Sequence, residues 1–435
     1  MVTGRFIVLW LAGGVPVLLV ALAPGWLAVV IAWHAALVIL AVADWLAIPP
    51  RSSLSARRIL DDSLTQGIPA RVAVEVANES SRRAEVAVKD MPPADFQVSR
   101  REMSTRLEAG TARRLEYEVL SYERGRFRFA DIYLRATGPL GLCWRQYRHS
   151  AGADVTAGPD VKAITREQLA LELGAQSLFA RRRMRHWQRG SEFAHHREYY
   201  PGDDYRHISW KASARRGRLV TKEYEVQRSQ PLFILMDTAR MMTTRIGPYS
   251  RLDYAVNAAL QLAGAALRRH DLVGALAFSG EVKDFLPVSK GTWQWRRIVD
   301  FMGSLQPDYS EPDFASAYAY LLARTRQRSL IVTFTDLANP AGADTLARYN
   351  IQIARHHLPL CVSIEDSDVA AEAARAPRKA ADVYRKAVAC EVVQDTERTI
   401  ARLERGGVLV VHVGAHTLSS AAVRRYLEIK YRNLL

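Results

Sequence analysis

The pattern of apolar and polar positions changes along the chain, and it begins with two long apolar stretches. Residues 6–23 hold no charged side chain, and residues 26–48 hold only His34 and Asp44 as ionisable groups. As helices the two stretches would be about 27 and 34 Å long, and the apolar core of a bilayer is about 30 Å thick. The intervening Pro-Gly pair favours a tight turn, so we predict a transmembrane helical hairpin.

The basic residues beside the apolar stretches predict the orientation of this hairpin. Arg5 precedes the first stretch, Arg51, Arg57 and Arg58 follow the second, and the connecting turn has neither Lys nor Arg. Lys and Arg are enriched in the cytoplasmic segments of membrane proteins. We therefore expect both ends of the hairpin, and the chain that follows it, to lie in the cytoplasm.

Two features of the apolar stretches allow a second interpretation. Residues 21–23 read Ala-Leu-Ala, which is typical of a signal-peptide cleavage site, but Pro24 directly after them disfavours cleavage. Asp44 lies near the end of the second stretch, so we expect its side chain to extend to the membrane interface. A functional site within the membrane is the alternative for this aspartate.

Between residues 54 and 144 the apolar positions alternate with a period of two. Such alternation is typical of strands with one buried face, and Gly, Pro, Asn and Ser clusters between the stretches predict turns. Several short strands at this spacing predict an antiparallel β-sandwich of immunoglobulin-like outline, which we interpret as an interaction or spacer module. The alternating stretches are 71–78, 84–89, 115–120 and 127–134.

After residue 230 apolar runs alternate with helical segments. Residues 232–236 form a run that ends at Asp237, and residues 329–335 form another that ends at Asp336. This alternation predicts a doubly wound, largely parallel sheet, in which ligands bind at the carboxyl ends of the strands. Both aspartates lie at such ends. Further strands are predicted at 272–278, 282–288, 358–364 and 408–413, and helices at 252–267 and 418–434.

Composition restricts the class of protein. Of the 435 residues 49% are hydrophobic, which is enough for folded cores, and the net charge of +15 favours anionic surfaces without specifying a fold. Cys143, Cys361 and Cys390 are too far apart in the sequence for a cysteine zinc motif or a disulfide scaffold. The chain has no G-x-S-x-G, H-E-x-x-H or Walker motif, so we do not expect an enzyme.

The segment 190–228 is the most densely charged part of the chain. It carries eight basic and six acidic side chains together with aromatic residues that an ordinary linker would lack. Arginine and carboxylate groups in such number favour charge-assisted hydrogen bonds. We therefore predict a docking segment that locks the soluble domains to each other, with Trp210 at its centre.

The order of residues in this segment resembles a bacterial family known as domain of unknown function 58. The resemblance lies in G-x-E-F followed by R-E-Y-x-P-G-D-D-x-R-x-I-x-W-K-x-S-A-R, which covers residues 190–224. It implies an α/β domain similar to the von Willebrand factor A fold, and association with ATPases of the MoxR type, within the AAA+ class. The interaction residues that we take from this signature are Arg197, Glu198, Tyr199, Gly202, Asp203, Asp204, Arg206, Trp210, Lys211 and Arg215.

The resemblance also implies a place for a divalent ion. In the von Willebrand factor A fold the ion is held by D-x-S-x-S after the first strand, by a Thr from a later loop, and by an Asp after the fourth strand; such oxygen ligands suit magnesium. In this chain the first motif begins at Asp237, but Ala239 and Met241 replace both hydroxyl residues, and residues 309–314 contain no Thr. Only Asp237 and Asp336 remain.

Two carboxylates without a cation would repel each other. We therefore predict a degenerate metal site at Asp237 and Asp336, in which Arg240 stands in place of the ion, and we expect no cofactor. An intact magnesium site is the alternative. The carboxylates of the signature, Asp203 and Asp204, lie among arginines that should lower their pKa values, so we do not expect them to act as general acids.

Two other groups of residues are candidate sites. The basic run 181–189 could contact nucleic acid phosphates or anionic lipid, but such runs are most often solvated or face a protein, and we predict no nucleic acid partner. The pairs His195-His196 and His356-His357 are poorly placed to bind a metal, because adjacent residues of a strand point to opposite faces.

These observations predict a multidomain, non-catalytic adaptor in the bacterial inner membrane. Its partners would be a MoxR-type AAA+ ATPase, implied by the resemblance, and a protein client. The alternatives are a metal-dependent hydrolase and a cation-dependent ligand-binding receptor that use an Asp237/Asp336 cleft. The predicted segments are a transmembrane helical hairpin (1–50), a β-sandwich domain (51–150), a basic connector (151–189), the signature segment (190–228) and a von Willebrand factor A-like domain (229–435).

Overall fold

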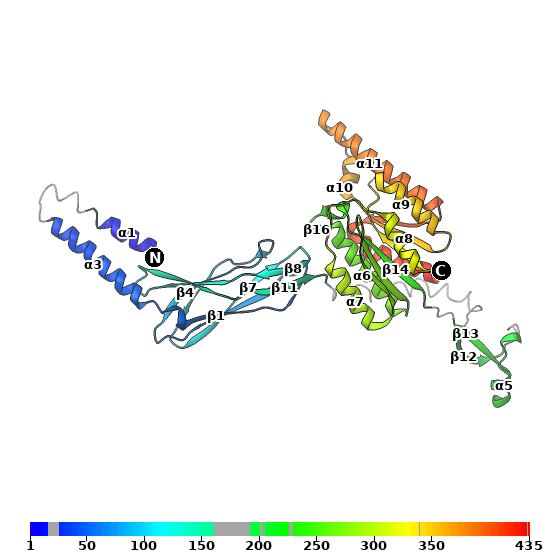
Figure 1. Cartoon of the computed structure of the whole chain (residues 1–435), viewed down its shortest axis with the longest axis horizontal. Helices are drawn as coiled ribbons and strands as arrows, with labels where there is room; N and C mark the ends of the chain where they lie inside the picture. Colours follow the sequence, from blue (N-terminus) through cyan, green and yellow to red (C-terminus); the bar gives the residue numbers. More distant parts are fainter. Residues whose placement is uncertain are drawn as a thin grey trace. The chain divides into compact units, whose positions relative to one another are not determined.

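The chain folds into two compact units, Met1–Gly158 and Pro159–Leu435, in the computed structural model drawn in Figure 1. The structure describes residues 1–15, 26–160, 192–200, 203, 205–225, 229–338, 340–432 and 434–435. The basic run and most of the predicted connector lie outside these residues, as do Gly202 and Asp204 of the signature.

The first unit begins with two apolar helices, α1 (Gly4–Ala12) and α3 (Trp26–Ala47). The 22 residues of α3 make it long and apolar enough to cross a membrane, and no other helix among the described residues meets that test. The two helices contact each other: Trp33 Nε1 donates to the Leu9 carbonyl over 3.2 Å, and the Trp10 ring lies edge-on to His34. The predicted turn and the second half of the first predicted span lie outside the described residues.

The end of α3 is fixed to the β-sandwich through Asp44. This residue is only 1% exposed, and its carboxylate accepts hydrogen bonds from the backbone N–H groups of Leu140, Leu142 and Cys143 over 2.7–2.8 Å. Asp44 is therefore a contact between α3 and the sandwich, which the sequence did not predict. Three backbone N–H groups satisfy the hydrogen-bonding capacity of this buried carboxylate.

The same loop also holds the beginning of the chain. The Thr3 N–H donates to the Leu142 carbonyl over 2.9 Å, and the Trp144 N–H donates to the Met1 carbonyl over 2.8 Å. A Cβ atom on Gly138 would come within 2.3 Å of the Asp44 carboxylate, so a larger residue there would force the two segments apart. Both apolar helices are thus attached to one loop of the sandwich, 138–144.

The rest of the first unit is the predicted β-sandwich. Its two larger sheets have the orders β1-β3-β7-β5 and β10-β9-β4-β6, and a third has the order β2-β11-β8. Alternate residues of each strand point into the core; in β3 these are Val72, Val74 and Val76, which are fully buried. The stretch 127–134 forms parts of two strands rather than one, since residues 130–131 belong to neither strand. The strands are β1 (Leu54–Ile59), β2 (Ser63–Thr65), β3 (Ala70–Asn78), β4 (Ala84–Asp90), β5 (Gln97–Val98), β6 (Met103–Leu107), β7 (Thr111–Leu120), β8 (Gly125–Phe129), β9 (Ile132–Thr137), β10 (Trp144–His149) and β11 (Ala153–Gly158).

The second unit contains the predicted doubly wound sheet. Its order is β18-β17-β14-β19-β20-β21, and all neighbours are parallel except β18 with β17. The strands are β14 (Pro231–Asp237), β17 (Leu272–Phe278), β18 (Val282–Ser289), β19 (Leu330–Phe334), β20 (Leu358–Glu365) and β21 (Leu409–Gly414).

Helices cover both faces of this sheet, which explains why its strands are continuously apolar. Alternate residues of β14 enter two separate cores: Leu232 and Ile234 pack with α6, α7 and α12, whereas Phe233 and Leu235 pack with α8, α9 and the end of α11. The helices are α6 (Arg251–Arg268), α7 (Gly291–Ser304), α8 (Phe314–Arg324), α9 (Pro340–Ile353), α10 (Ser367–Ala374), α11 (Ala380–Arg405) and α12 (Leu418–Tyr431).

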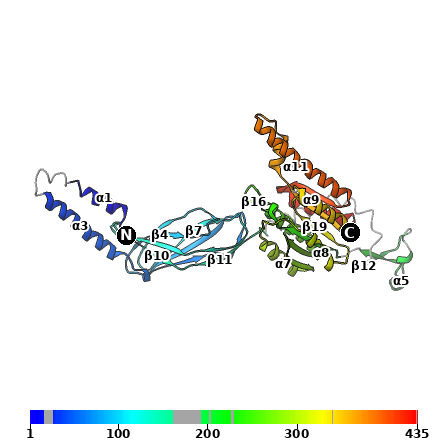
Figure 2. The ribbon, with the colours of Figure 1, turned by 45° about the horizontal axis from the view of Figure 1, so that its top comes forward.

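The signature segment forms a small element of its own. Strands β12 (Glu192–Glu198) and β13 (Val220–Glu225) pair in antiparallel fashion, and the chain between them forms the short helices η3 (Tyr205–His207) and α5 (Trp210–Arg216). Figures 1 and 2 show this hairpin with α5 at its end.

Candidate functional site

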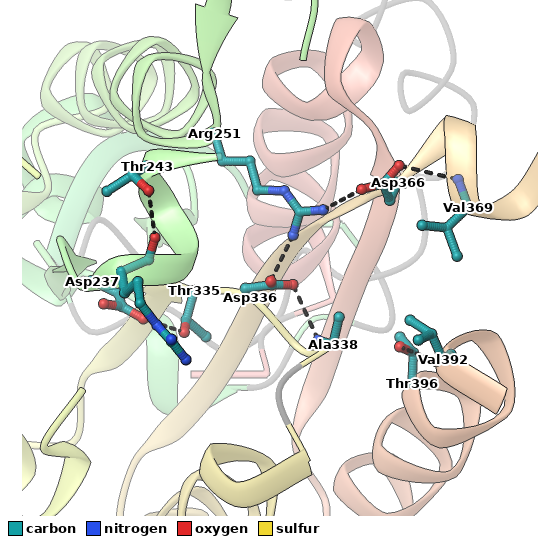
Figure 3. A network of polar contacts seen from close by, with 11 residues as sticks. Asp237, Thr243, Arg251, Thr335, Asp336, Ala338, Asp366, Val369, Val392 and Thr396 are labelled. Carbon is teal, nitrogen blue, oxygen red and sulfur yellow. Dashed lines mark hydrogen bonds and ion pairs between the residues drawn. The ribbon is translucent and has the colours of Figure 1, made fainter. Parts of the chain in front are cut away.

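Three neighbouring strands of the α/β sheet end in acidic residues. Asp237 ends β14, Asp336 follows β19, and Asp366 follows β20. Because these strands are parallel and adjacent in the sheet, their carboxyl ends meet at one edge, as predicted for the first two. Helix α6 begins at Arg251 beside this edge, and Figure 3 shows its guanidinium between Asp336 and Asp366.

Arg251 joins two of the three carboxylates. Its Nη1 lies 2.6 Å from Asp336 Oδ2, and its Nη2 donates to Asp366 Oδ2 over 2.7 Å. The side chains of Arg251 and Asp336 are 5% and 3% exposed, and that of Asp366 is 28% exposed. A guanidinium that is shared in this way neutralises both acids, and in a dry site the pairing is necessary because each charge alone would be costly.

Backbone donors hold the same carboxylates from the other side. Asp336 Oδ1 accepts from the Ala338 N–H over 3.1 Å, and Asp366 accepts from the Asp368 and Val369 N–H groups at the start of α10. The acids therefore have little freedom to reorient toward a ligand.

Asp237 has different hydrogen-bond partners, a threonine hydroxyl and a backbone N–H group. It is 2% exposed, and it accepts hydrogen bonds from the Thr335 hydroxyl over 2.6 Å and from the Ala239 N–H over 2.8 Å. Burial raises the pKa of Asp237 to about 6, although the two hydrogen bonds oppose that shift and the nearby charge of Asp336 adds to it. This carboxyl group changes its charge in the mildly acidic range.

The prediction that Arg240 takes the place of the cation is wrong. Arg240 pairs with Glu311 over 2.7 Å, and both side chains are more than half exposed. The buried positive charge comes from Arg251, because the fold places the start of α6 at the strand ends. The sequence offered one signal for this residue, since Arg251 directly precedes the predicted helix 252–267.

The residues at this edge do not fit a divalent ion. Asp336 and Asp366 are engaged by a guanidinium that would repel a second cation, and both oxygens of Asp237 already accept hydrogen bonds. Among the described residues no group of three His, Cys, Asp or Glu side chains could hold a metal. The cavity beside Arg251 has a volume of about 10 Å³, which admits about one water molecule and no substrate.

The histidines of the two adjacent pairs that the structure describes have surroundings that do not suggest a metal site. His196 hydrogen-bonds Ser209 over 3.1 Å, and the side chain of His195 lies outside the described residues. His357 is buried in the turn before β20, and burial lowers its pKa. Neither pair forms a metal-ligand set among the described side chains.

The signature makes contacts between arginine and carboxylate groups, as predicted from its charge pattern. Arg197 donates two hydrogen bonds to Asp203 over 2.8 and 2.9 Å, and these bonds lower the pKa of Asp203. Glu198 pairs with Arg218. Trp210 is 67% exposed at the start of α5. Tyr199 is partly buried, whereas Arg206, Lys211 and Arg215 are exposed.

An apolar N-terminal helix, a strand-rich body and a C-terminal α/β unit define a multidomain protein with a candidate membrane anchor. Residues 195–372 match the family described as "Protein of unknown function DUF58", which confirms the resemblance predicted from the signature. The "Uncharacterized protein YeaD" of Bacillus subtilis (strain 168) is 25% identical over 203 residues, which are 46% of this chain and 47% of that protein. The chain thus aligns with about half the length of this relative.

Likenesses to solved structures are slight. A "conserved hypothetical protein BatB" from Bacteroides thetaiotaomicron has a TM-score of 0.34 and 16% identity, over 47% of this chain and 99% of that chain. The CARDB domain of the PF1109 protein from Pyrococcus furiosus has a TM-score of 0.18 and 14% identity, over 24% of this chain and 86% of that domain.

Proposed function

We propose that this chain is a non-catalytic adaptor anchored in the bacterial inner membrane. One observation carries the proposal: the acidic side chains at the ligand-binding edge of the α/β sheet are already engaged, two of them by the buried Arg251. A hydrolase needs an acid, a base or a metal with access to substrate, and the cavity at this edge has no room for one. A cation-dependent receptor needs open ligand positions, which Arg251 occupies.

The anchor is proposed to be a two-helix hairpin with the soluble units in the cytoplasm. Support comes from the length and apolarity of α3, from the contact between α1 and α3, and from the positive-inside distribution of Arg5 and Arg51. The attachment of α3 to the sandwich through Asp44 favours an anchor that holds the sandwich directly rather than through a flexible tether.

Reporter fusions test this topology. Alkaline phosphatase and green fluorescent protein fused after Leu435 should give fluorescence and no phosphatase activity, because phosphatase matures only outside the cytoplasm. A fusion placed after α1 should give the reverse result if the turn reaches the periplasm. Phosphatase activity at the C-terminus would reject the proposed orientation.

The partner is proposed from the family resemblance alone. Members of the resembled family are usually associated with MoxR-type AAA+ ATPases and carry a domain of the von Willebrand factor A fold. Both features are proposed for this chain. The adaptor would present a client to the ATPase for assembly or remodelling at the membrane.

Co-purification tests this partner. Full-length chain extracted from native membranes in mild detergent should retain a MoxR-type ATPase, and mild crosslinking should increase its recovery. An unrelated inner-membrane protein with a similar tag serves as the control. Recovery of the chain alone, with and without crosslinker, would reject the adaptor function.

A further inference from the structure

Helix α11 is only partly used by the core of the α/β unit. Its last turns pack against α9 and β21, where Leu403 is fully buried. Helix α10 also contacts α11, and Figures 1 and 2 show the orange beginning of α11 projecting beyond the sheet. With 26 residues the helix is about 39 Å long, so this beginning forms an arm.

The exposed face of the arm is an apolar stripe. Ala380, Val383, Tyr384, Ala387 and Val388 recur at the i, i+3, i+4, i+7, i+8 spacing of a core-facing helix. All five are exposed, and Val383, Tyr384 and Val388 are 54%, 76% and 60% exposed. Single apolar residues on a surface need no explanation, but a regular stripe of this kind is typical of a helix that packs against another surface.

Basic residues surround this stripe. Residues 375–388 contain Arg375, Arg378, Lys379, Arg385 and Lys386 against one acid, Asp382, which gives a net charge of five minus one, or +4. Asp382 accepts hydrogen bonds from the backbone N–H groups of Arg378 and Lys379. The arm therefore combines an apolar seam with positive flanks.

We propose that this stripe is a docking surface for a protein partner with an apolar groove and an acidic rim. The partner's acids would pair with the flanking arginines and lysines, while the groove would cover Tyr384 and the two valines. The family match ends at residue 372, so the surface lies outside the part of the chain that the family defines. The inference rests on the adaptor function proposed above and specifies the chemistry of its partner.

Two other occupants fit less well. A second copy of the chain would bring two arms of charge +4 together, and that repulsion opposes self-association. An anionic membrane would attract the charge, but helices that lie in a membrane interface insert Trp, Phe and Leu. This stripe contains alanine, valine and one tyrosine, and its alanines at 380 and 387 leave room for a closely packed helix or groove wall.

Site-directed photocrosslinking tests the proposal in native membranes. The full-length chain carries p-benzoylphenylalanine at Tyr384, or at Glu397 as the matched control. Glu397 is an exposed residue of the same helix and lies about 220° around its axis from Tyr384. We expect one protein to be crosslinked from position 384 only, through a peptide that lines an apolar groove with acidic residues beside it.

Charge reversal checks the electrostatic part. Arg385→Glu with Lys386→Glu should lower the crosslinking yield about tenfold, and 0.5 M salt should lower it in the unmodified chain. Because Arg385 is exposed and Lys386 is only partly buried, circular dichroism and the melting temperature should not change.

Several outcomes would overturn the proposal: crosslinks to lipid, crosslinks to a second copy, equal yields at both positions, or a partner surface without acids. If no crosslink forms at 384 while the ATPase still co-purifies, the docking surface is wrong and the adaptor function stands. If the chain is isolated alone in both experiments, both proposals fail.

Discussion

Replacing Arg251 by methionine removes the charge that Asp336 and Asp366 share, and it keeps an unbranched side chain at the site. Asp336 is 3% exposed, so its carboxylate would be left buried without a cation. Breaking a buried pair in this way costs about 3–5 kcal/mol. Asp366 adds less to this cost, because its side chain is 28% exposed and water can solvate it.

Two further variants separate charge from packing. Adding Asp336→Asn to Arg251→Met should recover most of the lost stability, because a neutral amide is far less costly to bury than a carboxylate. Arg240→Met is the matched control: its ion pair with Glu311 is more than half exposed on both sides, and such surface pairs contribute about 0–1 kcal/mol.

Hydrogen exchange of the full-length chain in detergent measures these differences. Amides of β14 and β19 that exchange by opening of the sheet should exchange roughly a hundred to a few thousand times faster in Arg251→Met, since 1.4 kcal/mol corresponds to about tenfold. Exchange within about threefold of the unmodified chain, or a double variant as unstable as the single one, would refute the role assigned to Arg251.

Three more predictions follow from the geometry. Asp237 has a pKa of about 6 in the folded protein against 3.8 ordinarily, so the folded protein keeps this proton between those values and the free energy of unfolding should fall as the pH rises from about 4 to 6. The variant Asp237→Asn should lack this fall and be more stable than the unmodified chain above pH 6 by up to about 3 kcal/mol. Parallel pH profiles of urea unfolding for the two proteins would contradict this prediction. Asp44→Ala leaves the N–H groups of Leu142 and Cys143 buried without their acceptor, which should lower the local stability by about 1–3 kcal/mol for each group. Hydrogen exchange at residues 138–144 should therefore become faster, and unchanged exchange there would contradict the prediction. Calorimetric titration with Mg²⁺ or Mn²⁺ should give no saturable binding in the micromolar range, and micromolar binding that Asp237→Ala abolishes would show that the metal interpretation was correct.

Local patterns were enough to predict most of the fold. Residues 71–78 alternate because one face of β3 is buried, and residues 232–236 are continuously apolar because β14 has a helical layer on each side. The apolar stretch 26–48 contains α3. Each pattern reflects the environment of a short segment, so it can be read without knowing which distant residues lie nearby. The pairing of Arg197 with a signature carboxylate, six residues away, is likewise local.

The tertiary structure alone decided which charges meet. Arg240 and Arg251 both follow Asp237 closely in the sequence, but only Arg251 lies at the strand ends, where it reaches Asp366, 115 residues away. Asp44 looked like an acid near the end of a membrane helix, and its donors are backbone N–H groups up to 99 residues away. Backbone donors have no signature in side-chain identity, and an ion pair depends on distance in space. The sequence therefore determined the segments and their classes, whereas the fold determined the partners of their buried charges.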